Sequence, residues 1–437
     1  MSIQFDRSMS DAPHRTQPEG TADGSMQGGG IVFGLVTIYL VLDLIRPSFV
    51  WHFPKIISMI LVIAWITKAS KIWCPQMTSY VCFLGIMGFD ILLAENTFDA
   101  AWATYGMFTL LIGVCVPLIN FTDSLKKLRQ LIHVMLAIYL YVAVYAITHE
   151  GYGPAGAAGG QDENYVAAAM NLVIPLALFS FFAEKTIWKK VLFATFVGLY
   201  LLTIVVGLSR GGFVGLLCGL GFSLLKTPKK GLAILAAVLI VGFLGVVAGS
   251  SYWEEMGTIT DPSEGTADLR LEYWKIATQE FLAYPLTGVG ADNYRWRTHE
   301  FQSPEQMEKF GHILTSHVHS TYFQLLAEMG IAGYLVFGFF LYRTYRDHRH
   351  VDQLRDRYHT LFAGRSSAAE EDLRWMQVYA RGLMGGMIGY LVSVAFLSSL
   401  YYSHLWIAGS MIAALYAIAM RRINEEDCAR MCAEVSK

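Results

Sequence analysis

The chain has 437 residues, of which 54% are hydrophobic and only 16% are charged, and its formal net charge at pH 7 is −2. This composition is far from that of an ordinary soluble domain and indicates a polytopic membrane protein. Nucleic-acid binding would require a clustered basic face, which the sequence does not contain. We therefore expect no nucleic-acid partner.

The six cysteines give no sign of a disulfide framework, since none lies in a segment that we place outside the membrane's inner face. Cys428 and Cys432 are one helical turn apart, but a zinc site needs more ligands than this pair supplies. All six are interpreted as ordinary thiols.

Residues 1–29 are polar and contain no apolar run, so they cannot bury enough surface to offset the entropy of ordering. We expect a disordered cytoplasmic tail. A cleavable signal peptide is not predicted, because the first apolar run begins near Ile31 and no small-residue cleavage site follows it.

Long apolar runs recur through the rest of the chain, most of them close to the roughly 20 residues that cross a bilayer core. They lie near 31–50, 54–73, 78–94, 100–119, 131–148, 164–183, 189–208, 211–225, 231–249, 321–342, 377–398 and 402–420. This pattern predicts an all-α integral membrane protein with about twelve transmembrane helices. The first nine fall within 30–249, the last three within 321–420, and a cytoplasmic tail follows at 421–437.

The loops alternate in charge, as the positive-inside rule requires. Of the 33 Lys and Arg residues, roughly 25 fall on one side, which we assign to the cytoplasm together with both termini. This side includes the loop 343–376, whose mixed charges over 343–374 favour a solvated helical pair.

The loop 250–320 lies on the opposite, periplasmic side and is too long for a simple connection. Its segment 267–285 is predicted to form an amphipathic helix, with Leu269, Tyr273 and Ile276 on one face, that lies on the outer membrane surface. A Pro- and Gly-rich turn at 285–290 would reverse the chain beneath this helix.

Two histidines, His317 and His319, close this loop in the segment SHVHSTYFQLLAEMGIAG (316–333), where an apolar helix begins. A neutral imidazole fixed at a membrane surface can act as a general base for a hydroxyl nucleophile. The alternative is a helix flank with incidental polarity.

Two arginines belong to the same outer side. Arg210, in LSRGG, stands at a helix boundary, where an arginine needs an anionic partner or extends toward the headgroups. Arg270 lies in the amphipathic segment and could simply pair with Asp268 or Glu272.

Asp162 and Asn164 begin the sixth apolar run on this side as well. Both residue types satisfy free backbone donors at a helix start, so capping is the favoured interpretation. A role near the histidines is the alternative.

Together these segments resemble the O-antigen ligase and O-antigen polymerase superfamily, integral-membrane glycosyltransferases of the GT-C type. The resemblance is carried by SRGGFVGLL (209–217), by Arg270–Trp274 followed by PLTGVGADNY (285–294), and by HVHSTYFQLLAEMGIAG (317–333). It is most specific over about 160–340. The family often has Asn after the loop-end histidine, whereas this chain has Ser320.

The resemblance implies a role for each candidate residue. It places Arg210 and Arg270 on the lipid diphosphate of an undecaprenyl-diphosphate-linked glycan, and it makes His319 the base. His317 would support or orient the substrate, and Asp162 and Asn164 match the family's polar helix start.

Two arginines can stabilise the charge that grows on the leaving phosphate. The outer loops contain no carboxylate or Cys/His cluster with ligand spacing, so we expect a metal-independent reaction without cofactors.

The expected function is inverting transfer of a glycan to an acceptor hydroxyl at the periplasmic face of the bacterial inner membrane. Lipid A-core as acceptor would make the protein an O-antigen ligase, which we favour. Polymerisation onto another lipid-linked glycan and transfer to a protein hydroxyl remain open. An alternative of another class is a transporter of lipid-linked glycans, embedded like the enzyme among membrane lipids.

Overall fold

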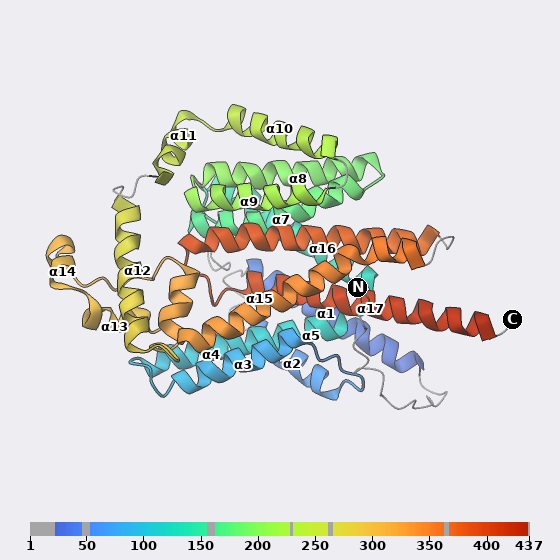
Figure 1. Ribbon diagram of the computed structural model, residues 1–437, viewed down its shortest axis with the longest axis horizontal. Helices are drawn as coiled ribbons and strands as arrows, with labels where there is room; N and C mark the ends of the chain where they lie inside the picture. The colour runs from blue at the N-terminus through green and yellow to red at the C-terminus, as the bar shows by residue number, and fades with distance from the viewer. Residues whose placement is uncertain are drawn as a thin grey trace, which may run out of the picture.

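The computed structural model describes residues 22–45, 53–154, 162–227, 230–260, 265–361 and 367–435. Within these ranges every regular element is helical, which confirms the prediction of an all-α, multi-pass membrane protein. Most helices run side by side along the long axis, and helix α12 crosses one end of the bundle (Figure 1).

Each predicted apolar run coincides with a helix or a continuous helical unit. A helix satisfies its own backbone hydrogen bonds, as an apolar environment requires. The units are α1 (Ala22–Ile45), α2 (Phe53–Thr67), α3 (Pro75–Asp90), α4 (Thr97–Leu110) continued by a π-helical turn (Leu111–Cys115) and α5 (Val116–Phe121), α6 (Leu125–Thr148), α7 (Glu163–Ala183), α8 (Ile187–Val206), α9 (Arg210–Lys226), α10 (Lys230–Val247), α15 (Thr321–Leu361), α16 (Ser367–Ser393) and α17 (Ser403–Val435).

Fewer of the described helices are long and apolar enough to span a membrane than the sequence pattern predicts. Among the described residues, 7 helices are long and apolar enough to cross a membrane, and the pair α10 and α11 (Ser250–Gly257), bent by 110°, would make up to 8. Helices α3 and α9 have 16 and 17 residues, fewer than the roughly 20 that a span needs. The count of about twelve therefore stays a prediction.

The tail predicted to be disordered, 1–29, overlaps the first described helix, and its disorder stays a prediction. Residues 22–29 belong to α1, while the remainder of that tail lies outside the described residues. Helix growth adds one hydrogen bond per residue once a nucleus exists, so a stable apolar helix extends into adjoining polar residues.

The centre of the bundle is α7, which packs against α9 and α16. The side-chain amide of Asn171 on α7 donates to the Gly212 carbonyl at 2.7 Å and to the Ser393 hydroxyl at 2.9 Å, joining the three helices. At Gly386 on α16, a Cβ would lie only 1.9 Å from the Leu172 carbonyl oxygen. Small residues at such crossings let helices approach closely where the hydrophobic effect gives little driving force.

The charge pattern of 343–374 favoured a solvated helical pair, but one face of this segment is buried. On the inner face of α15, Asp347, His348 and Asp352 are all at most 5% exposed. Lys226 on α9 donates to Asp352 at 2.7 Å, and Gln76 on α3 donates to Asp347 at 2.7 Å. These long-range partners make burial of the charges possible, and the sequence pattern could not reveal them.

The amphipathic segment forms α12 (Gly265–Ala283), but its apolar face does not lie on the membrane surface as predicted. Tyr273, Ile276 and Ala277 are at most 5% exposed and pack against Tyr294, Leu314, Val318 and Ala327. The helices α13 (Tyr294–Phe301) and α14 (Pro304–Phe310) follow it in the chain. The long loop therefore forms its own small apolar core at the end of the bundle.

The turn at 285–290 joins this small core to α15. Helix α15 breaks at Gly330, which has φ 57° and ψ −158°. The amides freed at the break, those of Ile331 and Ala332, donate to the carbonyls of Pro285 and Leu286 at 2.9 and 3.1 Å. Because these groups are satisfied by the turn, the break holds the start of α15 and α12 together.

We expect Gly386→Ala to destabilise the protein by about 1–3 kcal/mol, because the added methyl group must push α16 away from α7. The measurement is the midpoint of thermal unfolding in detergent, which should fall by several degrees. Gly338→Ala is the matched control, since a Cβ there meets nothing within 4 Å. Equal midpoints for the two variants would contradict the proposed close packing.

Candidate active site

A polar cavity of about 160 Å³ lies where the first turns of α7 and α9 meet α11 and α12. Arg210 and Arg270 both line it, although 60 residues of sequence separate them. Asn164, Glu163 and Glu255 supply the other polar groups. The structure thus brings together three of the residues predicted from the sequence.

Arg210 is the first residue of α9, directly after the cap Ser209, whose hydroxyl accepts from the Gly212 amide. Its Nε lies 3.2 Å from Glu255 Oε1, and its Nη1 donates to Thr258 Oγ1 at 2.8 Å. The side chain is 15% exposed. Arg210 therefore has the anionic partner that an arginine at this depth requires, and extension toward the headgroups is not how it is accommodated.

Arg270 projects from the first half of α12 into the same cavity. Asp268 and Glu272, the two carboxylates near it in the sequence, each form an ion pair with a lysine. Lys309 Nζ lies 2.7 Å from Asp268 Oδ2, and Lys275 Nζ lies 2.9 Å from Glu272 Oε1.

Asp162 and Asn164 have separate structural roles. Asp162 caps α7, accepting from the amides of Asn164 and Tyr165 at 2.7 and 3.3 Å, as the favoured interpretation predicted. Asn164 accepts a 2.8 Å hydrogen bond from the Ser209 hydroxyl, which fixes the start of α7 to the start of α9. Of the two, Asn164 lines the cavity.

His319 lies beside the cavity, just before α15. Its amide donates to Ser398 Oγ at 2.9 Å, and the adjoining residue Leu397 lines the cavity. Its ring is 5.8 Å from that of Tyr273, one turn along α12 from Arg270. Burial lowers the pKa of His319, and the charges of Arg270 and His317 lower it further. The imidazole is therefore neutral at pH 7 and able to accept a proton.

His317 is exposed and does not line the cavity. His317 interacts electrostatically with Asp292. Burial raises the pKa of Asp292, while the charges of Arg295 and His317 lower it. The two histidines therefore have different environments.

Ser320 occupies the position where the family often has Asn. It is 1% exposed, and its carbonyl accepts from the Gln324 amide at 2.8 Å in the first turn of α15. The next residue, Thr321, donates to the Leu397 carbonyl at 2.7 Å. These polar residues thus anchor the helix start to the segment after α16, and Ser320 is too buried to contact a sugar.

Residues 195–338 match the family model described as O-antigen ligase. This match supports the resemblance to the O-antigen ligase and polymerase superfamily over about a third of the chain. The matched segment contains Arg210, Arg270, His317 and His319, whereas Asp162 and Asn164 precede it. No curated protein matches the chain.

Two acidic cavity residues, Glu163 and Glu255, were not predicted from the sequence. Glu163 stands between Asp162 and Asn164 and could have been noticed there. Its Oε1 accepts from the side-chain Nδ2 of Asn164 at 3.0 Å. Glu255 carries no sequence signal, because only the bend between α10 and α11 brings it to Arg210.

Among the described residues, no three His, Cys, Asp or Glu side chains are grouped as metal ligands would be. Metal independence stays a prediction, which transfer assays with a chelator can test.

We expect the His319 imidazole to titrate below pH 6.5, because burial and the charge of Arg270 disfavour its protonated form. Arg270→Gln should raise this pKa toward its usual value. NMR of the protein with ¹³C-labelled histidine measures it, with the His319 signal assigned from a His319→Gln spectrum. Lys275→Gln, on the same helix but 63% exposed, should leave the pKa unchanged. A pKa that Arg270→Gln does not move would contradict the placement of these two side chains.

Proposed function

We propose that the protein is an inverting glycosyltransferase that moves a glycan from undecaprenyl diphosphate to an acceptor hydroxyl. The observation that carries the proposal is the meeting of Arg210 and Arg270 at one cavity, with the neutral imidazole of His319 beside it. The similarity of residues 195–338 to the O-antigen ligase family supports the same reaction class.

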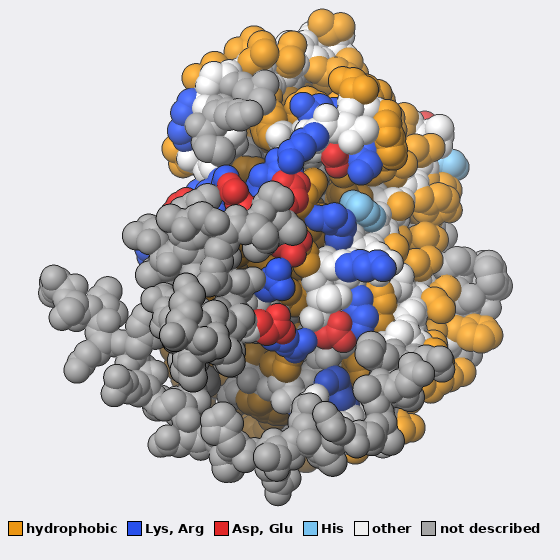
Figure 2. Space-filling model, turned by 90° about the vertical axis from the view of Figure 1, so that its right-hand side faces the viewer, with side chains coloured by type: hydrophobic (Ala, Val, Ile, Leu, Met, Phe, Trp, Pro, Cys, Tyr) orange, Lys and Arg blue, Asp and Glu red, His pale blue; other side chains and the backbone are white. Residues whose placement is uncertain are grey.

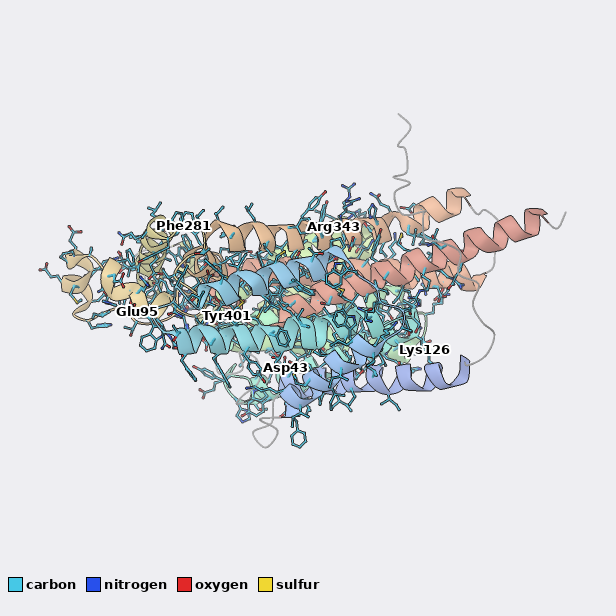
Figure 3. The ribbon with its side chains drawn as sticks, turned by 90° about the horizontal axis from the view of Figure 1, so that it is seen from below. Asp43, Glu95, Lys126, Phe281, Arg343 and Tyr401 are labelled. Carbon is cyan, nitrogen blue, oxygen red and sulfur yellow. The ribbon has the colours of Figure 1, made fainter. Side chains whose placement is uncertain are left out.

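The orientation that we propose places the cavity on the periplasmic side of the bacterial inner membrane and both termini in the cytoplasm. Lys and Arg side chains gather on the end of the bundle opposite α12 (Figure 2), as expected for a cytoplasmic face. In a second view, Phe281 and Glu95 lie toward the α12 end, and Lys126 lies toward the other (Figure 3).

The chemistry assigned to these residues is a single displacement. The acceptor oxygen bonds to the anomeric carbon while the bond from that carbon to the diphosphate oxygen breaks, and its electron pair leaves with the undecaprenyl diphosphate. Arg210 and Arg270 stabilise the charge that develops on this leaving group with charge-assisted hydrogen bonds. His319 takes the acceptor's proton. Attack from the face opposite the diphosphate inverts the anomeric configuration.

Within this reaction class we favour an O-antigen ligase, whose acceptor is lipid A-core. Polymerisation onto a second lipid-linked glycan and transfer to a protein share the same handling of the donor and differ in the acceptor. A transporter is less well supported. Transporters often bind substrate at the free backbone groups of a broken helix, but the amides freed at the break in α15 donate to the carbonyls of Pro285 and Leu286.

The decisive experiment is transfer by the purified protein in liposomes, with chelator present and with lipid A-core, a lipid-linked glycan or a protein as acceptor. We expect product on lipid A-core. His319→Ala should abolish transfer and retain donor binding, because the base is lost while both arginines remain. His299→Ala, an exposed histidine on α13, is the control. Transfer that survives His319→Ala would remove the proposed base, and product on another acceptor alone would replace the ligase assignment.

We expect Arg210→Lys to lower kcat/KM for the donor about 10- to 100-fold, since a hydrogen bond to a charged group contributes about 1.5–3 kcal/mol and lysine lacks the planar fork. Glu255→Gln should lower the donor KM, because Glu255 competes with the diphosphate for Arg210. Steady-state kinetics measures both effects, with Glu254→Gln as the neighbouring control. Full activity of the lysine variant, or equal KM values for the two glutamine variants, would argue against diphosphate binding by Arg210.

A further inference from the structure

A second cavity, of about 300 Å³, lies between α6, α8 and α16. It is formed near the first turns of α6 and α8, where the basic loops of the sequence are found, and not at the α12 end. Its walls are largely aromatic and include Phe193, Phe196 and Trp375, with Arg129 and Lys189 among its charged residues. The proposed glycosyl transfer uses none of these residues.

Arg129 is held in place by its Nε and by an aromatic ring, which leaves its two terminal nitrogens available. Its Nε donates to the Tyr379 hydroxyl at 3.1 Å, and its guanidinium carbon lies 4.8 Å from the centre of the Trp375 ring. Within the described part of the chain, its two terminal nitrogens have no hydrogen-bond partner. A guanidinium fixed by its inner nitrogen and by an aromatic face can present its outer nitrogens to an anion.

Lys189 supplies a second cation on the same cavity wall. Its Nζ lies 3.7 Å from Glu184 Oε2, beyond ordinary hydrogen-bond length. The other oxygen of Glu184 accepts from the amides of Lys185 and Thr186 at 2.9 and 3.2 Å. This carboxylate is therefore shared with the start of α8, and the cavity keeps a net positive charge from Arg129 and Lys189.

The apolar part of the cavity continues onto the outer face of α8. Leu192 lines the cavity and is 41% exposed, and Trp188, which also lines it, is 62% exposed. Val191, beside them, is 58% exposed. In a membrane-spanning bundle this face meets lipid, so an apolar chain can enter the cavity from the bilayer.

We propose that this cavity binds an anionic glycerophospholipid. Arg129 and Lys189 take the phosphate at the polar boundary, and an acyl chain lies along Leu192 and Phe196. The combination of two cations with an aromatic, membrane-facing wall favours a lipid over a free phosphate ion, which would use only the cations. Basic pockets between transmembrane helices on the cytoplasmic side are suited to such headgroups.

The test is native mass spectrometry of the purified protein titrated with phosphatidylglycerol, with a phosphatidylcholine of the same acyl chains, and with inorganic phosphate. We expect one phosphatidylglycerol to bind at least tenfold more tightly than phosphatidylcholine. The double variant Arg129→Gln, Lys189→Gln should lose this preference. Equal affinity for the two lipids, or displacement of phosphatidylglycerol by inorganic phosphate at similar concentration, would overturn the proposal.

A second variant separates lipid binding from general damage to the fold. Leu192→Trp fills the apolar entrance and keeps both cations, so it should weaken phosphatidylglycerol binding while thermal unfolding stays at the wild-type midpoint. The matched control is Lys71→Gln, Lys126→Gln, which removes two exposed cations from the same side of the molecule and should leave binding unchanged. Loss of binding in this control, or wild-type binding in Leu192→Trp, would show that surface charge alone attracts the lipid.

Discussion

Capping of helix ends is the constraint on which the site depends. The interior of an apolar helix satisfies its own hydrogen bonds, but its first turn leaves free amides that need polar partners. Asp162, Ser209 and Ser320 stand at the starts of α7, α9 and α15. The catalytic candidates are next to these caps in the chain. Arg210 follows Ser209, and His319 precedes Ser320. The same requirement that starts each helix therefore gathers polar side chains at one end of the bundle.

Charge within the cavity is balanced by carboxylates that belong to the protein. An unpaired arginine at the boundary of an apolar bundle carries a large desolvation cost, which the ion pair of Arg210 with Glu255 offsets. A diphosphate carries more negative charge than one carboxylate and offers oxygens to both arginines at once. In the proposed reaction, the diphosphate would replace Glu255 as the partner of Arg210, and the Glu255 side chain, which is 40% exposed, would then be hydrated by solvent.

The sequence predicted the helices well because apolar runs and loop charges are local signals. The amphipathic character of α12 was also visible, but its partner was not. Periodicity shows that one face is apolar and cannot say whether lipid or protein covers it; here Leu314, Val318 and Ala327 do. The buried Asp352 illustrates the same limit, since its cationic partners Lys226 and Arg381 come from helices far along the chain. The bend after α10 places Glu255 at the site, and no pattern in the sequence predicts that bend.

His319 shows how the site is held in shape. Its φ of 54° is unusual for a residue with a side chain and costs on the order of 1–3 kcal/mol. Two hydrogen bonds to the segment after α16 offset this cost. The His319 amide donates to Ser398 Oγ, and the Thr321 hydroxyl donates to the Leu397 carbonyl. A strained residue persists only where its surroundings determine it in this way. Since Leu397 also lines the cavity, the contacts that impose this backbone conformation also hold the start of α15 beside the cavity.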